Sequence, residues 1–175
     1  AANTTKFQHW YWPLGAEIAG DGRVYVFLAE MVERTPGYLG WTEPVATVVA
    51  GINVDNLLVE VTSSPANSSA SLYGFSIESD NVWTYLYAQC HRQFGFDPYI
   101  FVWAHDQSCS SRVTVARVPR GQLLATPTYW SGTRWQPDPA LAAPVISQAD
   151  RMVNASQIVY SHGNWMAITK VGDWW

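Results

Sequence analysis

The chain has 175 residues, a net charge of −4 at neutral pH, 48% hydrophobic residues and 14% charged residues. This length fits a single domain with a sizeable core. The weak negative charge, with basic residues that form no run or stripe, argues against a nucleic-acid partner. No window reaches the roughly 18 consecutive apolar residues of a membrane-spanning helix. We therefore expect one domain over residues 1–175 with no membrane span.

The aromatic content is unusual for a chain with so few charges. Ten tryptophans and nine tyrosines suit an all-β protein with stacked sheets or a sugar-binding surface. Aromatic side chains in an ordinary core would explain most of them. The composition therefore favours an all-β fold and leaves a sugar-binding surface as one interpretation.

The first region, residues 9–62, has the pattern of an antiparallel sheet. A tight turn at Gly20-Asp21-Gly22 favours a hairpin. The runs that we expect to be strands are rich in apolar and β-branched residues and cover Trp10 to Ala19, Arg23 to Glu33, Ala46 to Asn53 and Leu57 to Val61. A linker rich in Ser, Pro and Asn, residues 63–71, marks the end of this unit.

The second region, residues 71–135, predicts an antiparallel unit of its own. Its expected strands are Leu72 to Ser79, Val82 to Ala88, Arg112 to Val118, and Tyr129-Trp130 turning toward Trp135. Successive side chains of a strand point to opposite faces, so Thr84 and Leu86 share one face while Tyr85 and Tyr87 share the other. Because both faces are apolar, we expect further sheets stacked on both sides of this one.

An insertion bracketed by Cys90 and Cys109 interrupts the second region. Oxidation would close a loop of about 20 residues and add about 3 kcal/mol in the chain-entropy model. We predict a disulfide and hence an exported protein, with two buried free thiols as the alternative. The sequence has no CxxC motif or His/Cys cluster. We therefore expect no metal and no other cofactor.

The third region begins after a Pro- and Ala-rich connection, residues 137–151, which holds one helical turn near Pro139 to Ala143. Met152 to Ser161 and Trp165 to Val171 are expected to form a hairpin around His162-Gly163-Asn164. The turns of the three regions recur at offsets of roughly 60 to 85 residues, which indicates a β-propeller with insertions. A β-sandwich is the alternative.

The propeller interpretation gives approximate blades at residues 9–62, 71–135 and 152–175, the last incomplete. A propeller must close, and about two and a half blades cannot close. The remaining blades are therefore expected on another segment or chain, unless the propeller interpretation is wrong.

Several segments carry a resemblance to a known family. They are WYWPLGAEIAGDGRVYVFLAEM at Trp10 to Met31, LYGFSIESDNVWTYLYAQCHRQFGFDP at Leu72 to Pro98, VTVARVPRGQL at Val113 to Leu123, and the ending NASQIVYSHGNWMAITKVGDWW. These resemble the five-bladed β-propeller proteins of actinobacteria long classed as a domain of unknown function. That group includes endo-D-arabinanases that cut the arabinan of mycobacterial cell walls. Its fold is akin to that of the family 43 and 62 glycosidases.

The resemblance covers the chain from about Trp10 to its end and implies a glycoside hydrolase that acts on cell-wall polysaccharide, most specifically arabinan. It also implies a secreted or cell-envelope location. In such propellers a further blade with an acidic residue precedes the Trp-Tyr-Trp-Pro strand, which here lies only ten residues from the start. One member of a catalytic carboxylate pair is therefore expected to be missing from this chain.

Glycoside hydrolysis needs two carboxyl groups across the scissile bond. In propellers the ligand site lies where the innermost strands meet the channel. Glu17 lies on the first of these predicted strands between Ala16 and Ile18, where partial burial would suit a general acid. A solvent-facing charge or an ion pair is the alternative. Asp97, in the insertion, is a second candidate, although Asp97-Pro98 is also an ordinary turn signal.

Aromatic and amide side chains on the predicted inner strands would suit a sugar. The candidates for substrate binding are Trp10, Trp12, Tyr73, Asn154 and Gln157. Packing between blades would need aromatic rings at the same places. The alternative function is accordingly a non-catalytic propeller that binds polysaccharide or a partner protein in the cell envelope.

Overall fold

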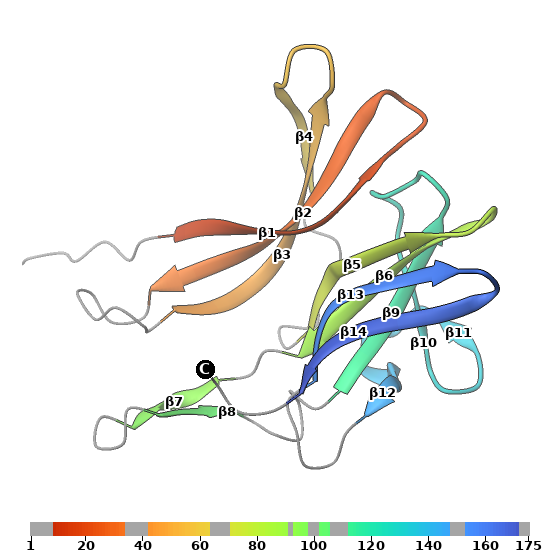
Figure 1. The fold of residues 1–175 in the computed structure, drawn as a ribbon. Coiled ribbons are helices and arrows are strands. Elements are labelled where there is room, and N and C mark those ends of the chain that lie inside the picture. Colours follow the sequence, from red (N-terminus) through yellow and green to blue (C-terminus); the bar gives the residue numbers. More distant parts are fainter. Residues whose placement is uncertain are drawn as a thin grey trace, which may run out of the picture.

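The computed structural model describes residues 9–33, 42–63, 71–90, 93–97, 102–105, 112–147 and 153–171. These residues form antiparallel β-sheets and one short 3-10 helix (Figure 1), which confirms the predicted all-β class. Within them the sheets do not close into a ring, so the propeller stays a prediction and a sandwich-like stacking also fits. The same ranges contain no helix with the length and hydrophobicity needed to cross a membrane.

The first sheet has its strands in sequence order, β1-β2-β3-β4. The strands are His9–Ile18 (β1), Arg23–Glu33 (β2), Thr42–Asn53 (β3) and Val59–Ser63 (β4). The predicted runs are confirmed with two differences: β3 begins at Thr42 rather than Ala46, and β4 covers Val59–Ser63 rather than Leu57 to Val61. The β1–β2 turn forms because the Asp21 carboxylate accepts the Arg23 backbone N–H and Gly22 takes a φ of +80°.

The second sheet is wider and has the order β11-β10-β9-β6-β5. Its strands are Ser71–Ser79 (β5), Trp83–Cys90 (β6), Arg112–Pro119 (β9), Thr128–Trp130 (β10), Trp135–Gln136 (β11) and Pro144–Ser147 (β12). The short β12 pairs with the beginning of β9, where sequence analysis predicted only a connection. The helical turn predicted in that connection is confirmed as a 3-10 helix, η1 (Pro139–Leu141), capped by Asp138.

Two hairpins complete the described structure. The strands Gln93–Asp97 (β7) and Val102–His105 (β8) pair within the insertion, which sequence analysis treated as a loop. The strands Val153–Ser161 (β13) and Asn164–Val171 (β14) form the predicted third hairpin. Its turn contains His162 and Gly163, both with positive φ.

Each face of the second sheet carries a buried apolar cluster, as the alternation of its side chains predicted. One face packs on the first sheet in a cluster formed by Ala19, Tyr25, Phe27, Val49, Tyr73, Leu86, Ala88, Ala116, Val118, Leu123 and Tyr129. The opposite face packs on β13 in a cluster formed by Tyr87, Val113, Val115 and Ile158. Leu86 and Tyr87, adjacent in β6, therefore belong to different cores.

The first strands of the three regions lie next to one another, because β5 contacts both β1 and β13. Bulges in β1 and β5 bring glycines together: a Cβ on Gly15 would lie 2.7 Å from the Gly74 carbonyl oxygen. On the other side, Ser76 Oγ accepts the Ile158 N–H at 2.9 Å and donates to the Ile158 carbonyl at 3.2 Å. The middle strand β5 is therefore joined to β1 by a close approach of the two backbones and to β13 by the hydrogen bonds of Ser76.

Candidate functional site

Glu17 lies near the end of β1, opposite Tyr25 of β2, and its side chain is partly buried as predicted. Its Oε1 accepts a hydrogen bond from Ser79 Oγ of β5 at 2.6 Å. Its Oε2 is shielded from solvent and has no hydrogen-bond partner among the described residues. The carboxylate is thus held by one oxygen, and its second oxygen retains full capacity to accept a donor.

A chain of hydroxyls holds the carboxylate. Ser79 Oγ also lies 2.7 Å from Oγ1 of Thr84, which is fully buried at the start of β6. A hydroxyl has one proton to donate, and Ser79 gives it to Glu17, so Thr84 donates to Ser79. The bonds run in one direction, from Thr84 through Ser79 to Glu17, and fix the position of the carboxylate between the first and second sheets.

The aromatic residues predicted to bind substrate differ in exposure. Trp12, on β1, is 52% exposed, and its neighbour Tyr11 is similarly open. Trp10 is partly buried against Ala29, Met31 and Leu72.

Tyr73 lies in the core, where its ring makes an edge contact with Tyr129 at 5.2 Å between ring centroids. Its hydroxyl accepts a hydrogen bond from Thr114 Oγ1. Burial raises the pKa of Tyr73 above its usual value. Of the predicted aromatic residues, Trp12 has the most accessible ring, whereas Tyr73 has the environment of a core residue.

The remaining predicted site residues are placed by their backbone alone. Asn154 and Gln157 lie on β13 on either side of its bulge. Asp97 ends β7, opposite Val102 of β8. Their side chains lie outside the description, so their roles stay predictions.

The predicted disulfide likewise stays a prediction. Cys90 ends β6, but its side chain is not described, and Cys109 lies outside the described residues.

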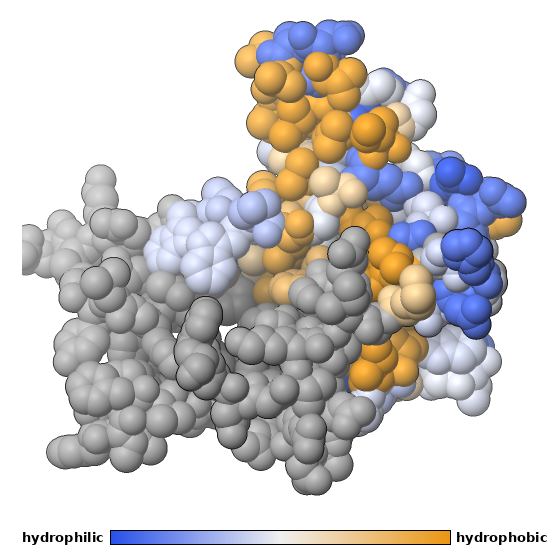
Figure 2. Space-filling model, in the orientation of Figure 1, coloured by the Kyte–Doolittle hydropathy of each residue, from blue (hydrophilic) through white to orange (hydrophobic). Residues whose placement is uncertain are grey.

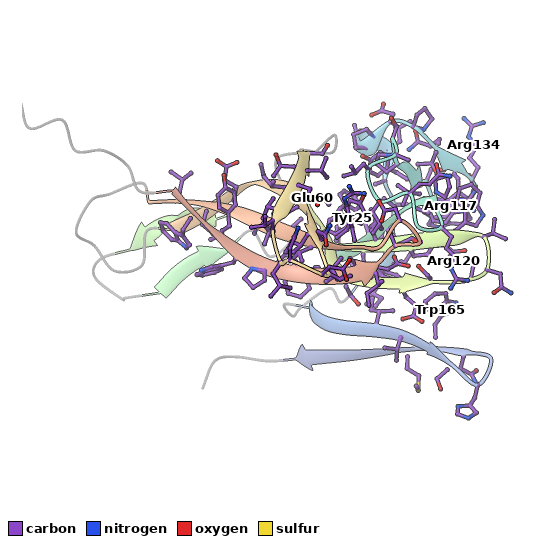
Figure 3. The ribbon with its side chains drawn as sticks, turned by 90° about the horizontal axis from the view of Figure 1, so that it is seen from above. Tyr25, Glu60, Arg117, Arg120, Arg134 and Trp165 are labelled. Atoms are coloured by element: carbon purple, nitrogen blue, oxygen red, sulfur yellow. The ribbon has the colours of Figure 1, made fainter. Side chains whose placement is uncertain are left out.

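An aromatic groove between the second sheet and the β13–β14 hairpin was missed by sequence analysis. It has a volume of about 550 Å³ and is lined by Tyr85, Tyr87, Val115, Trp130, Trp135, Val145, Ile146, Ile158, Trp165 and Met166. Trp165 of β14 makes edge contacts with Tyr85 and Tyr87, at 5.7 and 6.0 Å between ring centroids. Figure 3 shows Trp165 between the hairpin and the second sheet.

Arg117 of β9 lies beside this groove, between two indole rings. Its guanidinium carbon lies 3.9 Å from the centre of the Trp83 ring and 4.3 Å from that of Trp135, a cation–π geometry. In the neighbouring β5–β6 turn, the Asp80 carboxylate accepts the Trp83 and Val82 N–H groups and the Tyr85 hydroxyl. These backbone bonds lower the pKa of Asp80, which has the role of a turn residue.

The turn end of the first sheet carries a polar cluster beside an exposed apolar surface. Arg23 pairs with Asp21 at 3.0 Å and with Glu60 at 2.7 Å, and Tyr25 donates to Asp21. Apolar residues gather on the β3–β4 hairpin below its polar tip (Figure 2), and Leu57, in the turn of this hairpin, is 77% exposed. The described residues contain no cluster of His, Cys, Asp or Glu that could hold a metal ion.

Comparison with known proteins places the chain in a family. The model of DUF5005, a domain of unknown function, matches residues 1–173. No curated protein matches the chain in sequence.

Among solved structures, the chain is similar to the crystal structure of a candidate hydrolase from Bacteroides ovatus ATCC 8483, with a TM-score of 0.65 and 12% identity over 94% of this chain. The chain spans 39% of the length of that protein. At this identity the likeness shows a shared fold and no more.

Proposed function

We propose that this chain, which belongs to the DUF5005 family, is part of a glycoside hydrolase that cleaves cell-wall polysaccharide. The proposed substrate is arabinan, and the proposed location of the protein is secreted or in the cell envelope. Glu17 is proposed as one of the catalytic carboxyl groups. The structural neighbour is described as a candidate hydrolase, which supports a hydrolytic reaction without identifying a substrate.

The proposed architecture is a five-bladed β-propeller, with blades near residues 9–62 and 71–135 and an incomplete blade near 152–175. Two features support it. The first sheet is a meander, and the second follows the same order along β5, β6, β9 and β10. The first strands β1, β5 and β13 lie side by side, as the innermost strands of adjacent blades would.

The observation that carries the proposed activity is the state of the Glu17 carboxylate. Ser79 fixes Oε1 at 2.6 Å, while Oε2 is shielded and without a donor. A buried acceptor with no partner is costly by roughly 1–3 kcal/mol, and positioned acceptors of this kind are found where a ligand or a transferred proton completes the hydrogen bonds. A sugar hydroxyl could donate to Oε2, or Oε2 could carry the proton that Glu17, as the general acid, donates to the glycosidic oxygen. The second carboxyl group would come from outside this chain.

The test is release of oligosaccharides from arabinogalactan by the complete protein and by its Glu17→Gln variant. We expect the variant to lose at least about 100-fold in rate, as removal of a general acid or base does. Asp55→Asn, in the exposed β3–β4 turn, is the matched control and should retain full activity. Equal rates for wild type and Glu17→Gln would remove Glu17 from the mechanism. No release by wild type would reject arabinan as the substrate.

The exposed ring of Trp12 favours a second candidate, polysaccharide binding without cleavage. A flat aromatic face suits the CH face of a sugar, and this ring is 52% exposed on the first strand. Tryptophan fluorescence titrated with arabino-oligosaccharides would show binding that Trp12→Ala weakens. Binding without any release of oligosaccharides would support this second function over the first.

A further inference from the structure

Arg117 of β9 carries a charge that forms no ion pair with a carboxylate of the described residues. The ion pairs described above lie elsewhere, at Arg23. The Nε atom of Arg117 is shielded from solvent and has no hydrogen-bond acceptor in the same part of the chain. Buried donors nearly always have a partner. The unused donor of Arg117 is therefore a feature that a ligand with an acceptor oxygen would explain.

The carboxylate of Asp80, in the neighbouring β5–β6 turn, is already used. Its Oδ1 accepts the backbone N–H groups of Val82 and Trp83, and its Oδ2 accepts the Tyr85 hydroxyl. Hydrogen bonds from Trp83 and Val82 lower the pKa of Asp80 most, and the charge of Arg117 contributes least. Asp80 therefore stabilises the turn and leaves the guanidinium of Arg117 available.

Two indole rings hold this guanidinium in place. Its carbon lies 3.9 Å from the centre of the Trp83 ring and 4.3 Å from that of Trp135, so the rings approach it from different directions. The N–H groups of an arginine lie in one plane, and two neighbouring ones match the two oxygens of a carboxylate. The stacked Arg117 is therefore pre-organised to bind a carboxylate.

An apolar surface runs from Arg117 into the aromatic groove. The Trp135 ring lies 6.0 Å from that of Tyr85, which lies 5.7 Å from that of Trp165, measured between centroids. Figure 3 shows Arg117 on the second sheet and Trp165 on the neighbouring hairpin. The volume of about 550 Å³ and the apolar lining with few polar groups are typical of small-ligand sites. Trp165 is 48% exposed, so a ligand can reach its ring.

We propose that Arg117 and the aromatic groove form a binding site for an acidic saccharide. Arg117 binds the carboxylate of a uronic-acid unit, and the rings of Trp135 and Trp165 contact the CH faces of the sugar. The charges are complementary, because the site offers one unpaired cation at the end of an apolar surface. Flat aromatic faces suit sugar rings, and the guanidinium fork suits a carboxylate better than a hydroxyl.

This site is separate from the Glu17 carboxylate. Thr84, which supports Glu17 through Ser79, and Tyr85, which lines the groove, are adjacent in β6 and point to opposite faces of the second sheet. The sugar units of arabinan carry no charge, so the proposal goes beyond the cleavage of that polymer. Loss of arabinan cleavage would leave it standing.

The first test needs no substitution. Isothermal titration calorimetry of the complete protein would compare a galacturonic-acid trisaccharide with its methyl ester, which keeps the sugar rings and removes the charge. We expect the ester to bind at least about tenfold more weakly, because it loses a charge-assisted hydrogen-bonded pair. Raising the salt concentration from about 0.05 to 0.5 M should weaken only the acid. Equal affinities, or no binding of either saccharide, would overturn the proposal.

A peptide probe separates the sugar from its charge. Triglutamate carries carboxylates but no sugar ring, so it should bind at least about tenfold more weakly than the acidic trisaccharide. Equal affinity of the two probes would show that the site recognises carboxylates on any chain. That result would overturn the assignment of a saccharide.

The second test changes the arginine. Arg117→Lys keeps the positive charge but removes the planar fork, so binding of the acidic trisaccharide should weaken about tenfold while binding of the ester stays unchanged. Arg134→Gln, in the exposed β10–β11 turn, is the matched control and should bind both saccharides as the wild type does. If Arg117→Lys bound the acid with wild-type affinity, Arg117 would not be the residue that recognises the carboxylate.

Discussion

The two faces of the second sheet are both apolar, but they are packed in different ways. Small and aliphatic side chains such as Ala116 and Val118 close the face toward the first sheet around Phe27, which is completely buried. Aromatic rings dominate the face toward the β13–β14 hairpin, where Trp165 stays half exposed. One alternating set of strands therefore builds a dense core on one side and a partly covered groove on the other.

The largest effect should come from Phe27→Ala. Truncating a fully buried phenylalanine costs about 4 kcal/mol through lost burial and a residual cavity. Trp165→Ala on the other face should cost about 1–2 kcal/mol, because half of the ring is already exposed and edge contacts are worth about 1 kcal/mol. Urea unfolding of both variants measures the two losses. Similar losses would show that the two faces are packed alike.

Gly74→Ala should cause the second largest loss of unfolding free energy. A Cβ at this position would lie 2.3 Å from Phe27 Cδ1, and the backbone has a φ of +90°. Overpacking and left-handed strain together should cost about 3 kcal/mol.

Gly163→Ala is the matched control, because its φ is +79° but nothing lies within 4 Å. It should cost only about 1 kcal/mol. The difference in unfolding free energy between the two variants measures the close approach of β2 and β5. No difference would mean that Phe27 moves freely away.

Ser76→Ala should weaken the joint between β5 and β13. The substitution leaves the Ile158 N–H and carbonyl without their Ser76 partner in a buried site, at a cost of about 2 kcal/mol. Amide exchange at Ile158 should accelerate more than exchange in the first sheet. Ser131→Ala removes a hydrogen bond in an exposed turn, where water can replace it, and should have little effect. Uniform acceleration in both sheets would argue against a local joint.

The smallest effect is a pH dependence at the two hairpin turns. Hydrogen bonds from Trp83 and Val82 lower the pKa of Asp80, and the Tyr25 hydroxyl lowers that of Asp21. A lowered folded-state pKa stabilises the fold above the unfolded value of about 3.9, and this stabilisation is lost as pH falls through the folded value. The urea concentration at the unfolding midpoint should decrease as the pH falls below about 4. Asp80→Ala should make this decrease with pH less steep. If the urea midpoint of Asp80→Ala depended on pH as steeply as that of the wild type, the pH dependence would belong to other groups.

Local features of the fold could be predicted from the sequence. The turn residue Asp21 lies where expected, and the alternation along β6 assigned Leu86 and Tyr87 to opposite faces. The short β12 could not be predicted, because its only strand partner in the described structure is the edge of β9, about 30 residues earlier. Local composition at Pro144 indicates a connection.

The candidate site was predictable only in part. Glu17 was identified by its place on the first strand, but its partner Ser79 lies 62 positions away. The aromatic groove joins residues as distant as Tyr85 and Trp165, and no spacing in the sequence relates them. Each such pair depends on how whole sheets stack.

The sequence by itself determined the all-β class, the hairpins and the two-sided character of the second sheet, because strand alternation and turn chemistry are local properties of the backbone. Only the tertiary structure decided which faces meet, how closely Gly74 approaches Phe27, and that Ser79 anchors Glu17. Those contacts arise from packing between strands far apart in the chain, where the fit of side-chain volumes selects among many stackings that the same alternation permits.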